Sequence, residues 1–180
     1  MHMGFQSRTK TLSLFGGIVI VWFIFDRVVK MACDTVRPGT VLIPHVLGLF
    51  DFQLVHNTGA AWGMFGGSTA PLGVFSLLVC AGIAAYVFAY RKGRCSVLET
   101  VALSLVFAGG LGNAIDRLAM GYVVDFINCT FIDFPVFNIA DIGVTCGVAL
   151  FLLALLLESR KGEPLLDDPD NPMPGKTDSQ

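Results

Sequence analysis

Charge is scarce in this chain of 180 residues, because Asp, Glu, Lys and Arg make up only 14% of it. An average soluble domain carries about 25% charged residues. The composition therefore argues against a soluble globular enzyme and against a disordered chain. The net charge of −2 and the pI of about 5.8 provide no cationic surface for a phosphate backbone, so we expect no nucleic-acid partner.

Metal-binding and nucleophile motifs are also missing. The spacing of His45 and His56 gives no HExxH zinc site, and no GxSxG serine motif occurs. The sequence thus predicts neither a metal site nor a bound cofactor.

The five cysteines form no CxxC pair. Cys80 and Cys146 are interpreted as small core residues. Cys33 and Cys129 fall in connections expected on the same side of the membrane, and whether they pair is left open.

Apolar residues are abundant instead, at 54% of the chain with a mean hydropathy of +0.69. A bilayer core about 30 Å thick is crossed by roughly 20 helical residues. Segments apolar on all sides rather than along one stripe indicate membrane spans, and we predict them over residues 12–31, 71–90, 97–116 and 139–157. They form a single membrane-embedded domain over residues 1–161, and the acidic, Pro-rich residues 162–180 are predicted to be a disordered tail.

Basic residues predict the orientation of the spans. They precede the first span, join the second to the third and follow the fourth, at Arg8, Lys10, Arg91, Lys92, Arg94, Arg160 and Lys161. By the positive-inside rule these ends and both termini are cytoplasmic. The connections over residues 32–70 and 116–138 then lie outside.

Ionisable residues within spans are costly and mark functional sites. Here the intramembrane and membrane-edge polar groups gather toward the predicted outer face, at Asp26, Lys30, Asn113, Asp116, Arg117, Asp125, Asn138 and Asp141. Two carboxyl groups that share a site do not both ionise easily, so one retains its proton near neutral pH. Such a pair can activate water and polarise a carbonyl, which is aspartic-peptidase chemistry.

Several of these residues also have structural interpretations. Asp26 and Lys30 have the i,i+4 spacing of an ion pair, which is as compatible with stability as with function. Asp116 beside Arg117 is interpreted as structural. Asp141 is able to cap the fourth span, although Asn138 is the better cap.

The remaining polar and glycine positions are interpreted one by one. Asp125 lies between apolar neighbours with no local cation and is free to carry a shifted pKa. Asn57, in the Gly- and Ala-rich run over residues 57–63, is a candidate for placing donors near a substrate carbonyl. Gly109 and Gly110 are explained by close helix contact. The remaining outer acids are interpreted as solvated loop residues, at Asp34, Asp51 and Asp133.

Five motifs in this order resemble the bacterial lipoprotein signal peptidase family, signal peptidase II, over roughly residues 11–158. They are Asp26-x-x-x-Lys30, Asn57-x-Gly-Ala-Ala, Gly109-Gly-x-Gly-Asn-x-x-Asp-Arg117, Val123-Val-Asp-Phe126 and Phe137-Asn-x-Ala-Asp141. Arg27 departs from the Gln that is frequent in the family, and Trp62 from its usual Phe.

The resemblance implies an aspartic endopeptidase of the bacterial cytoplasmic (inner) membrane, with its active site toward the outer face. Its substrates would be diacylglyceryl-modified prolipoproteins, cleaved before the lipidated cysteine, and membrane lipid and globomycin-type inhibitors would be further partners. The catalytic pair would be Asp125 and Asp141. Substrate-binding or pocket-shaping roles would fall on Asp26, Lys30, Asn57, Gly59, Asn113, Asp116, Arg117, Asn138 and Ala140.

The implied fold is an α-helical bundle of four transmembrane helices with a small extracytoplasmic β-sheet and a short amphipathic helix. Residues 33–56 and 122–137 are the expected sources of these outer elements, because they contain many β-branched and aromatic residues. The alternative is a small proton-coupled carrier, but carriers usually show repeats and broken helices at the midplane. A purely structural four-helix protein would not need this many polar groups at one face.

Overall fold

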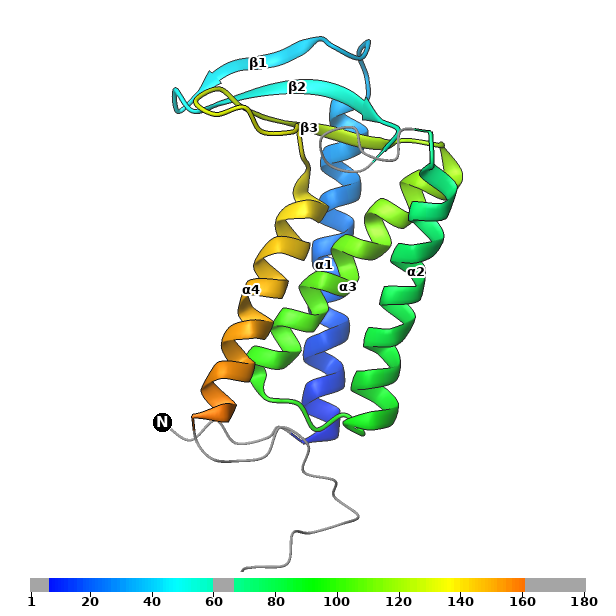
Figure 1. Cartoon of the computed structure of the whole chain (residues 1–180), viewed down its shortest axis with the longest axis vertical. Helices are drawn as coiled ribbons and strands as arrows, with labels where there is room; N and C mark the ends of the chain where they lie inside the picture. Colours follow the sequence, from blue (N-terminus) through cyan, green and yellow to red (C-terminus); the bar gives the residue numbers. More distant parts are fainter. Residues whose placement is uncertain (1–6, 60–66, 161–180) are drawn as a thin grey trace, which may run out of the picture.

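The computed structural model describes residues 7–59 and 67–160, which form a bundle of helices with a small sheet at one end (Figure 1). Four helices are long and apolar enough to cross a membrane, which confirms the expected architecture. Each predicted span falls on one of them. In chain order the elements are α1 (Arg8–Cys33), β1 (Val41–Val46), β2 (Phe50–Asn57), α2 (Thr69–Ala85), the π-helical turn η2 (Tyr86–Tyr90), α3 (Val97–Ala119), β3 (Val123–Cys129) and α4 (Ile139–Ser159).

Helix α3 is the centre of the bundle and packs against α1, α2 and α4. In its most apolar stretch 56% of the residues are buried, against 22% or less in the other three helices. Glycines permit this close approach: a methyl group added at Gly109 would lie 2.2 Å from the backbone oxygen of Ala140, and one added at Gly110 would lie 3.2 Å from Cys80 Sγ. The interpretation of both glycines as helix-contact residues is confirmed.

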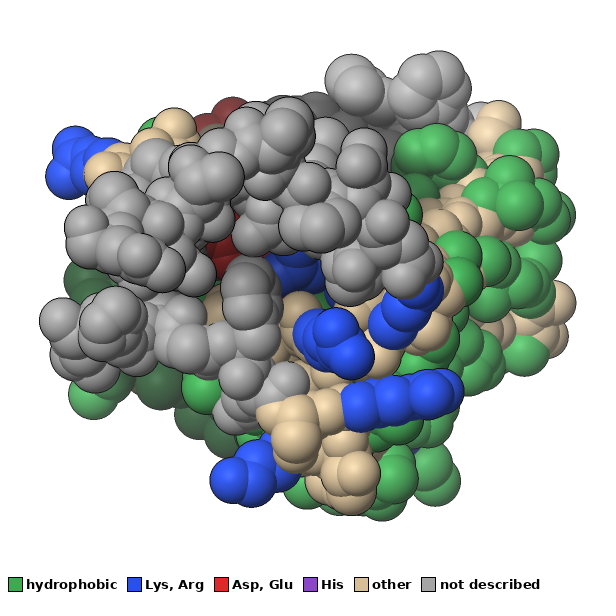
Figure 2. All heavy atoms as spheres, turned by 90° about the horizontal axis from the view of Figure 1, so that it is seen from below, with side chains coloured by type: hydrophobic (Ala, Val, Ile, Leu, Met, Phe, Trp, Pro, Cys, Tyr) green, Lys and Arg blue, Asp and Glu red, His purple; other side chains and the backbone are tan. Residues whose placement is uncertain are grey.

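A polar network closes the end of the bundle opposite the sheet. Ser96 and Glu99 form a capping box at the start of α3. The buried Glu99 carboxylate also accepts hydrogen bonds from Tyr86 Oη (2.9 Å) and from Arg91 Nη2 (3.2 Å). Lys and Arg side chains gather on this face (Figure 2), where α1 begins, η2 ends and α4 ends.

The sheet has three antiparallel strands in the order β1-β2-β3, and it arises from the two segments predicted for it. It is attached to the bundle by an apolar cluster in which Cys33 of α1 packs with Phe126 and Ile127 of β3 and with Phe52 of β2. Figure 1 shows the sheet projecting sideways past α4 from this attachment.

Two sequence predictions remain to be placed. The short amphipathic helix expected from residues 33–56 and 122–137 is not found in them: beyond the end of α1 these described segments form strands and turns, so that prediction was wrong. The predicted tail over residues 162–180 and Trp62 lie outside the described residues. All five cysteines are free, so Cys33 and Cys129 do not pair. Cys80 is buried, but Cys146 is exposed and its assignment to the core was wrong.

Candidate active site

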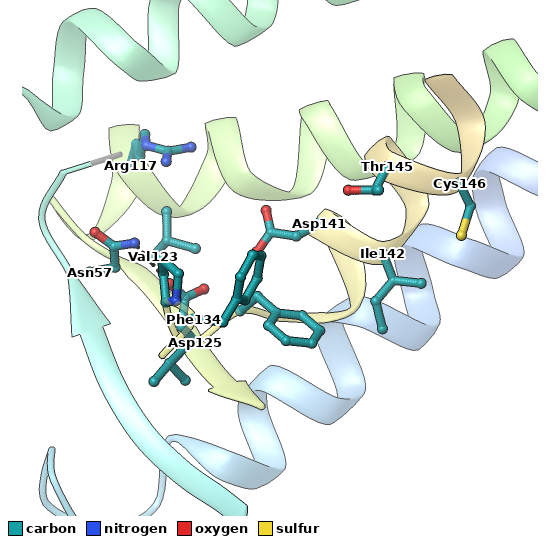
Figure 3. Close-up of a pocket in the computed structure, with 12 residues that line it drawn as sticks. Asn57, Arg117, Val123, Asp125, Phe134, Asp141, Ile142, Thr145 and Cys146 are labelled. Atoms are coloured by element: carbon teal, nitrogen blue, oxygen red, sulfur yellow. Dashed lines mark hydrogen bonds between the residues drawn. The ribbon is translucent and has the colours of Figure 1, made fainter. Parts of the chain in front are cut away.

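Asp125 and Asp141 reach one cavity from different elements (Figure 3). Asp125 lies in β3 opposite Val55 of β2, and Asp141 lies in the first turn of α4. The cavity has a volume of about 470 Å³. Its walls are formed by Asn57, Arg117, Val123, Asp125, Phe134, Pro135, Val136, Phe137, Asp141, Ile142, Thr145 and Cys146.

Asp125 is almost fully buried, with 2% of its surface exposed. Its Oδ2 accepts a hydrogen bond from Asn57 Nδ2 (2.9 Å), and its Oδ1 accepts one from Asn138 Nδ2 (2.6 Å). Burial, followed by the charge of Asp141, raises the pKa of Asp125 to about 7 despite these hydrogen bonds. This carboxyl group therefore exchanges a proton near neutral pH.

Asp141 is the third residue of α4 and is fixed by helix capping. Asn138 is the N-cap, as expected, and its Oδ1 accepts a hydrogen bond from the backbone N–H of Asp141 (3.0 Å). In return, Asp141 Oδ2 accepts from the backbone N–H of Asn138 (3.1 Å), while its Oδ1 accepts from Asn113 Nδ2 (2.7 Å). The capping geometry thus sets the direction in which this carboxyl group points.

Three asparagine amides contact the two carboxyl groups, and the orientation of each is set by a donor to its oxygen. Asn57 Oδ1 accepts from the backbone N–H of Gly59 (2.9 Å). Asn138 Oδ1 is occupied by the capping bond, and Asn113 Oδ1 accepts from Lys30 Nζ (2.7 Å) and from Asn138 Nδ2 (3.1 Å). Each amide nitrogen is consequently left to face a carboxylate.

Lys30 is buried, and its charge is balanced by two acids. Its Nζ lies 3.1 Å from Asp26 Oδ2 and 2.8 Å from Asp116 Oδ2. Arg27 pairs with the same two acids from the other side. These ion pairs join α1 to α3. Through the hydrogen bond from Lys30 to Asn113 they are also linked to Asp141 in α4.

The structure corrects the sequence interpretation of Asp116. Its partners are Arg27 and Lys30 of α1, whereas the neighbouring Arg117 lines the cavity and donates to the backbone oxygen of Gly59 (3.3 Å). Adjacent helical residues point about 100° apart. The Asp116 carboxylate therefore faces α1, whereas the Arg117 guanidinium faces the cavity.

Asp26 connects α1 to the start of α4. Its Oδ1 accepts a hydrogen bond from the backbone N–H of Ala140 (3.0 Å), one of the free donors of that helix end. Gly112 leaves room for the carboxylate, because an added methyl group would lie 2.8 Å from Asp26 Oδ2. Of the predicted site residues, four line the cavity: Asn57, Arg117, Asp125 and Asp141. Gly59, Asn113 and Asn138 are hydrogen-bonded to one of these four. Asp26, Lys30, Asp116 and Ala140 lie behind them and do not line the cavity.

Part of the cavity wall was not predicted from the sequence. Ile142, Thr145 and Cys146 follow Asp141 on α4 at spacings of one, four and five residues. Only the four-residue spacing, which places Thr145 on the same helix face as Asp141, would have indicated a further member. Phe134 and Phe137 belong to the β3–α4 connection, where no periodic pattern marks them.

A second missed feature is a contact between a histidine and two other outer residues. The His56 ring stacks on Tyr122, with centroids 3.8 Å apart, and His56 Nε2 lies 2.7 Å from Asp34 Oδ1. Asp34 is thus not the solvated loop acid that was predicted, whereas Asp133 is exposed as expected. Within residues 7–59 and 67–160, no group of three or more His, Cys, Asp and Glu side chains is arranged to hold a metal ion.

Similarity to known proteins agrees with this geometry. The family model described as "Signal peptidase (SPase) II", a peptidase family, matches residues 18–157. The chain belongs to the signal peptidase II family. A lipoprotein signal peptidase of Deinococcus radiodurans is 39% identical over 157 residues, which cover 81% of this chain and 81% of that protein. The lipoprotein signal peptidase of Staphylococcus aureus strain JH9 is 38% identical and covers 88% of this chain and 94% of its own length.

A solved structure described as a bacterial membrane enzyme superposes with a TM-score of 0.74 at 32% identity, covering 91% of this chain and 97% of that one. Signal peptidase II membership makes this chain a multi-pass membrane peptidase. None of these relatives supports the carrier alternative.

Proposed function

We propose that this chain removes the signal peptide from prolipoproteins carrying a diacylglyceryl-modified cysteine, by cleaving the peptide bond before that cysteine. Asp125 and Asp141 are the catalytic pair. The observation that supports this most strongly is that both carboxyl groups face one cavity in a chain of the signal peptidase II family.

The pair works with one proton between its two members. The ionised carboxylate takes a proton from water, and the water oxygen forms a bond with the scissile carbonyl carbon. The protonated carboxyl group donates a hydrogen bond to the carbonyl oxygen as negative charge develops there. Breaking of the C–N bond then releases the amine, which takes the proton that the first carboxylate had accepted.

The three asparagines are positioning residues in this reaction. Asn57, Asn113 and Asn138 donate to the carboxylate oxygens and hold the two groups in fixed directions. The buried ions Asp26, Lys30 and Asp116 hold Asn113 and the start of α4, where Ala140 lies. Arg117, which donates to the backbone oxygen of Gly59, lines the side of the cavity on which we place the substrate backbone. Globomycin-type inhibitors would occupy the same cavity.

The Lys and Arg side chains at one end of the bundle also support an orientation of the chain in the membrane. The positive-inside rule places that end in the cytoplasm, together with both termini. The sheet and the cavity then lie toward the outer face of the bacterial cytoplasmic membrane. A reporter enzyme active only outside the cytoplasm, fused after Gln180, should be inactive, whereas the same reporter inserted between β1 and β2 should be active.

The test of function uses the purified full chain and a synthetic precursor peptide with a diacylglyceryl group on its cysteine. Mass spectrometry should detect a product whose new amino terminus is that cysteine, and globomycin should suppress it. The matched control is the same peptide with an unmodified cysteine, which should not be cleaved. Cleavage at another bond, or equal cleavage of both peptides, would contradict the proposal.

A further inference from the structure

Four large apolar side chains are exposed at the free end of the sheet. Leu47 is the most exposed large apolar side chain of the described residues, at 86%, and Leu49 shares its turn at 44%. Phe131 and Ile132, which follow β3, are 58% and 50% exposed. We call these four residues the sheet tip.

The sheet tip is one continuous feature, although its residues come from two distant segments. The backbone N–H of Thr130 donates to the oxygen of Leu49 (2.9 Å), and the Phe131 ring packs edge-on against Phe50, with centroids 6.2 Å apart. Residues 46–50 and 127–132 contain no charged side chain. The neighbouring charges are Asp51 and the exposed Asp133, each next to one end of these ranges.

The backbone of the turn gives a second, independent signal. Leu47 has a φ of 53°, in the left-handed region that glycine and asparagine favour. The turn is fixed in this form, because Asp51 Oδ1 accepts a hydrogen bond from the backbone N–H of His45 (2.7 Å). A leucine therefore occupies an unfavourable backbone position at which its side chain contacts almost nothing within the molecule.

The level of the sheet relative to the bilayer indicates what covers the sheet tip. Helix α1 has 26 residues and is about 39 Å long. A bilayer measures about 30 Å across its hydrocarbon core and about 40–45 Å with its headgroup layers. The end of α1, to which the sheet is attached through Cys33, accordingly lies at headgroup level.

The position of the tip is continuous with the lipid-facing surface of the bundle. Figure 1 shows the β1–β2 turn and the end of β3 projecting to the side of the upper end of α4. Ile132 precedes Ile139, the first residue of α4, by seven positions. Helix α4 itself exposes apolar side chains, among them Val148 and Leu152.

We propose that the sheet tip inserts into the outer leaflet of the bilayer, at the boundary between headgroups and acyl chains. Its occupant is phospholipid, which covers apolar loop residues at this depth as it does interfacial helices. Insertion would hold Phe134 and Phe137, which follow the tip and form the cavity wall, at a constant depth. The inference does not require the proposed cleavage reaction.

The test places a tryptophan in the tip of the full chain, reconstituted in phosphatidylcholine vesicles. Leu47→Trp is compared with Thr40→Trp, an exposed position at the other end of β1. The emission of the parent chain is subtracted from that of each variant. Vesicles are prepared with lipids brominated either near the headgroup or near the acyl terminus.

We expect Leu47→Trp emission to be blue-shifted and quenched at least twofold more by the shallow bromines than by the deep ones. Thr40→Trp should emit as in water and be quenched by neither. Equal, water-like emission from both variants would overturn the proposal. So would a blue shift of Leu47→Trp that disappears when the protein is diluted with lipid, because a second copy of the chain would then cover the tip.

Discussion

Lys30 Nζ donates a 2.7 Å hydrogen bond to Asn113 Oδ1, and this bond determines which end of the amide faces Asp141. Asn138 Nδ2 donates to the same oxygen (3.1 Å), so without Lys30 the amide keeps one of its two donors and is held less firmly in this orientation. A buried ion pair in α1 thereby controls the hydrogen bonding of a carboxyl group in α4.

Lys30→Met should impair catalysis more than folding. Loss of one partner from a buried ion pair is destabilising by about 3–5 kcal/mol, and Arg27 keeps the effect at the low end because it still pairs with both acids. The turnover number should fall at least tenfold at a temperature at which the variant is fully folded, with little change in KM.

The matched control is Arg27→Gln, which removes an ion pair from the same two acids without touching Asn113. It should lower the thermal unfolding midpoint but retain most of the turnover. Equal loss of turnover in the two variants would show that the network acts through stability alone.

Asp125→Asn and Asp141→Asn should each abolish cleavage of the lipidated peptide while leaving the protein folded. The substitution preserves shape but removes the group that exchanges a proton. Asp133→Asn, at an exposed acid of the β3–α4 connection, is the control and should cleave normally. Turnover near that of the parent chain in either dyad variant would disprove the assignment.

The raised pKa of Asp125 predicts a pH dependence of both rate and stability. Its folded-state pKa is about 7, against an ordinary value of 3.8. Cleavage should therefore decline as the pH rises above about 7, because the pair loses its shared proton. The difference between these two pKa values also means that protonation of Asp125 stabilises the folded state relative to the unfolded state. The full contribution to the free energy of unfolding is about 4 kcal/mol.

That stabilisation is present below about pH 4 and is lost as the pH rises through about 7. Thermal unfolding midpoints measured in detergent from pH 4 to pH 8 should decline for the parent chain. Asp125→Asn should show a smaller decline over this window. Parallel curves for the two proteins would mean that another group is responsible.

The sequence predicted the spans and the face that carries the acids because both follow from one physical constraint. The thickness of a bilayer sets the length of an apolar helix, and an ionisable group near a helix end is placed at one face by counting residues. Asp125 and Asp141 could be brought to the same side in this way without knowledge of any contact.

Which side chains pair across helices was not predictable in the same manner. Such pairing depends on the rotation of each helix about its axis, and sequence neighbours do not reveal it. Asp116 was associated with the adjacent Arg117 but pairs with Arg27 and Lys30. Asp34 has its partner, His56, at a distance of 22 residues along the chain.

His56→Ala should reduce turnover several-fold through Asn57, the next residue of β2. The stack on Tyr122 and the contact with Asp34 tie the end of β2 to α1 and to the start of β3. Loosening this end allows Asn57 to move relative to Asp125. His45→Ala is the control, since its side chain is 82% exposed, and it should retain parental turnover.

Gly109→Ala tests whether the close contact between α3 and α4 sets the geometry of the cavity. The added methyl group would lie 2.2 Å from the backbone oxygen of Ala140, so α4 must shift at the turn that carries Asp141. Overpacking of this kind costs about 1–3 kcal/mol or more, and turnover should fall because Asn113 no longer reaches the carboxylate.

Gly16→Ala is the matched control, because nothing lies within 4 Å of a methyl group at that position of α1. It should leave turnover unchanged and raise stability slightly, by up to about 1 kcal/mol, from the better helix propensity of alanine. If Gly109→Ala were as active and as stable as Gly16→Ala, the α3–α4 contact would not be what positions Asp141, and its capping bonds with Asn138 would have to suffice alone.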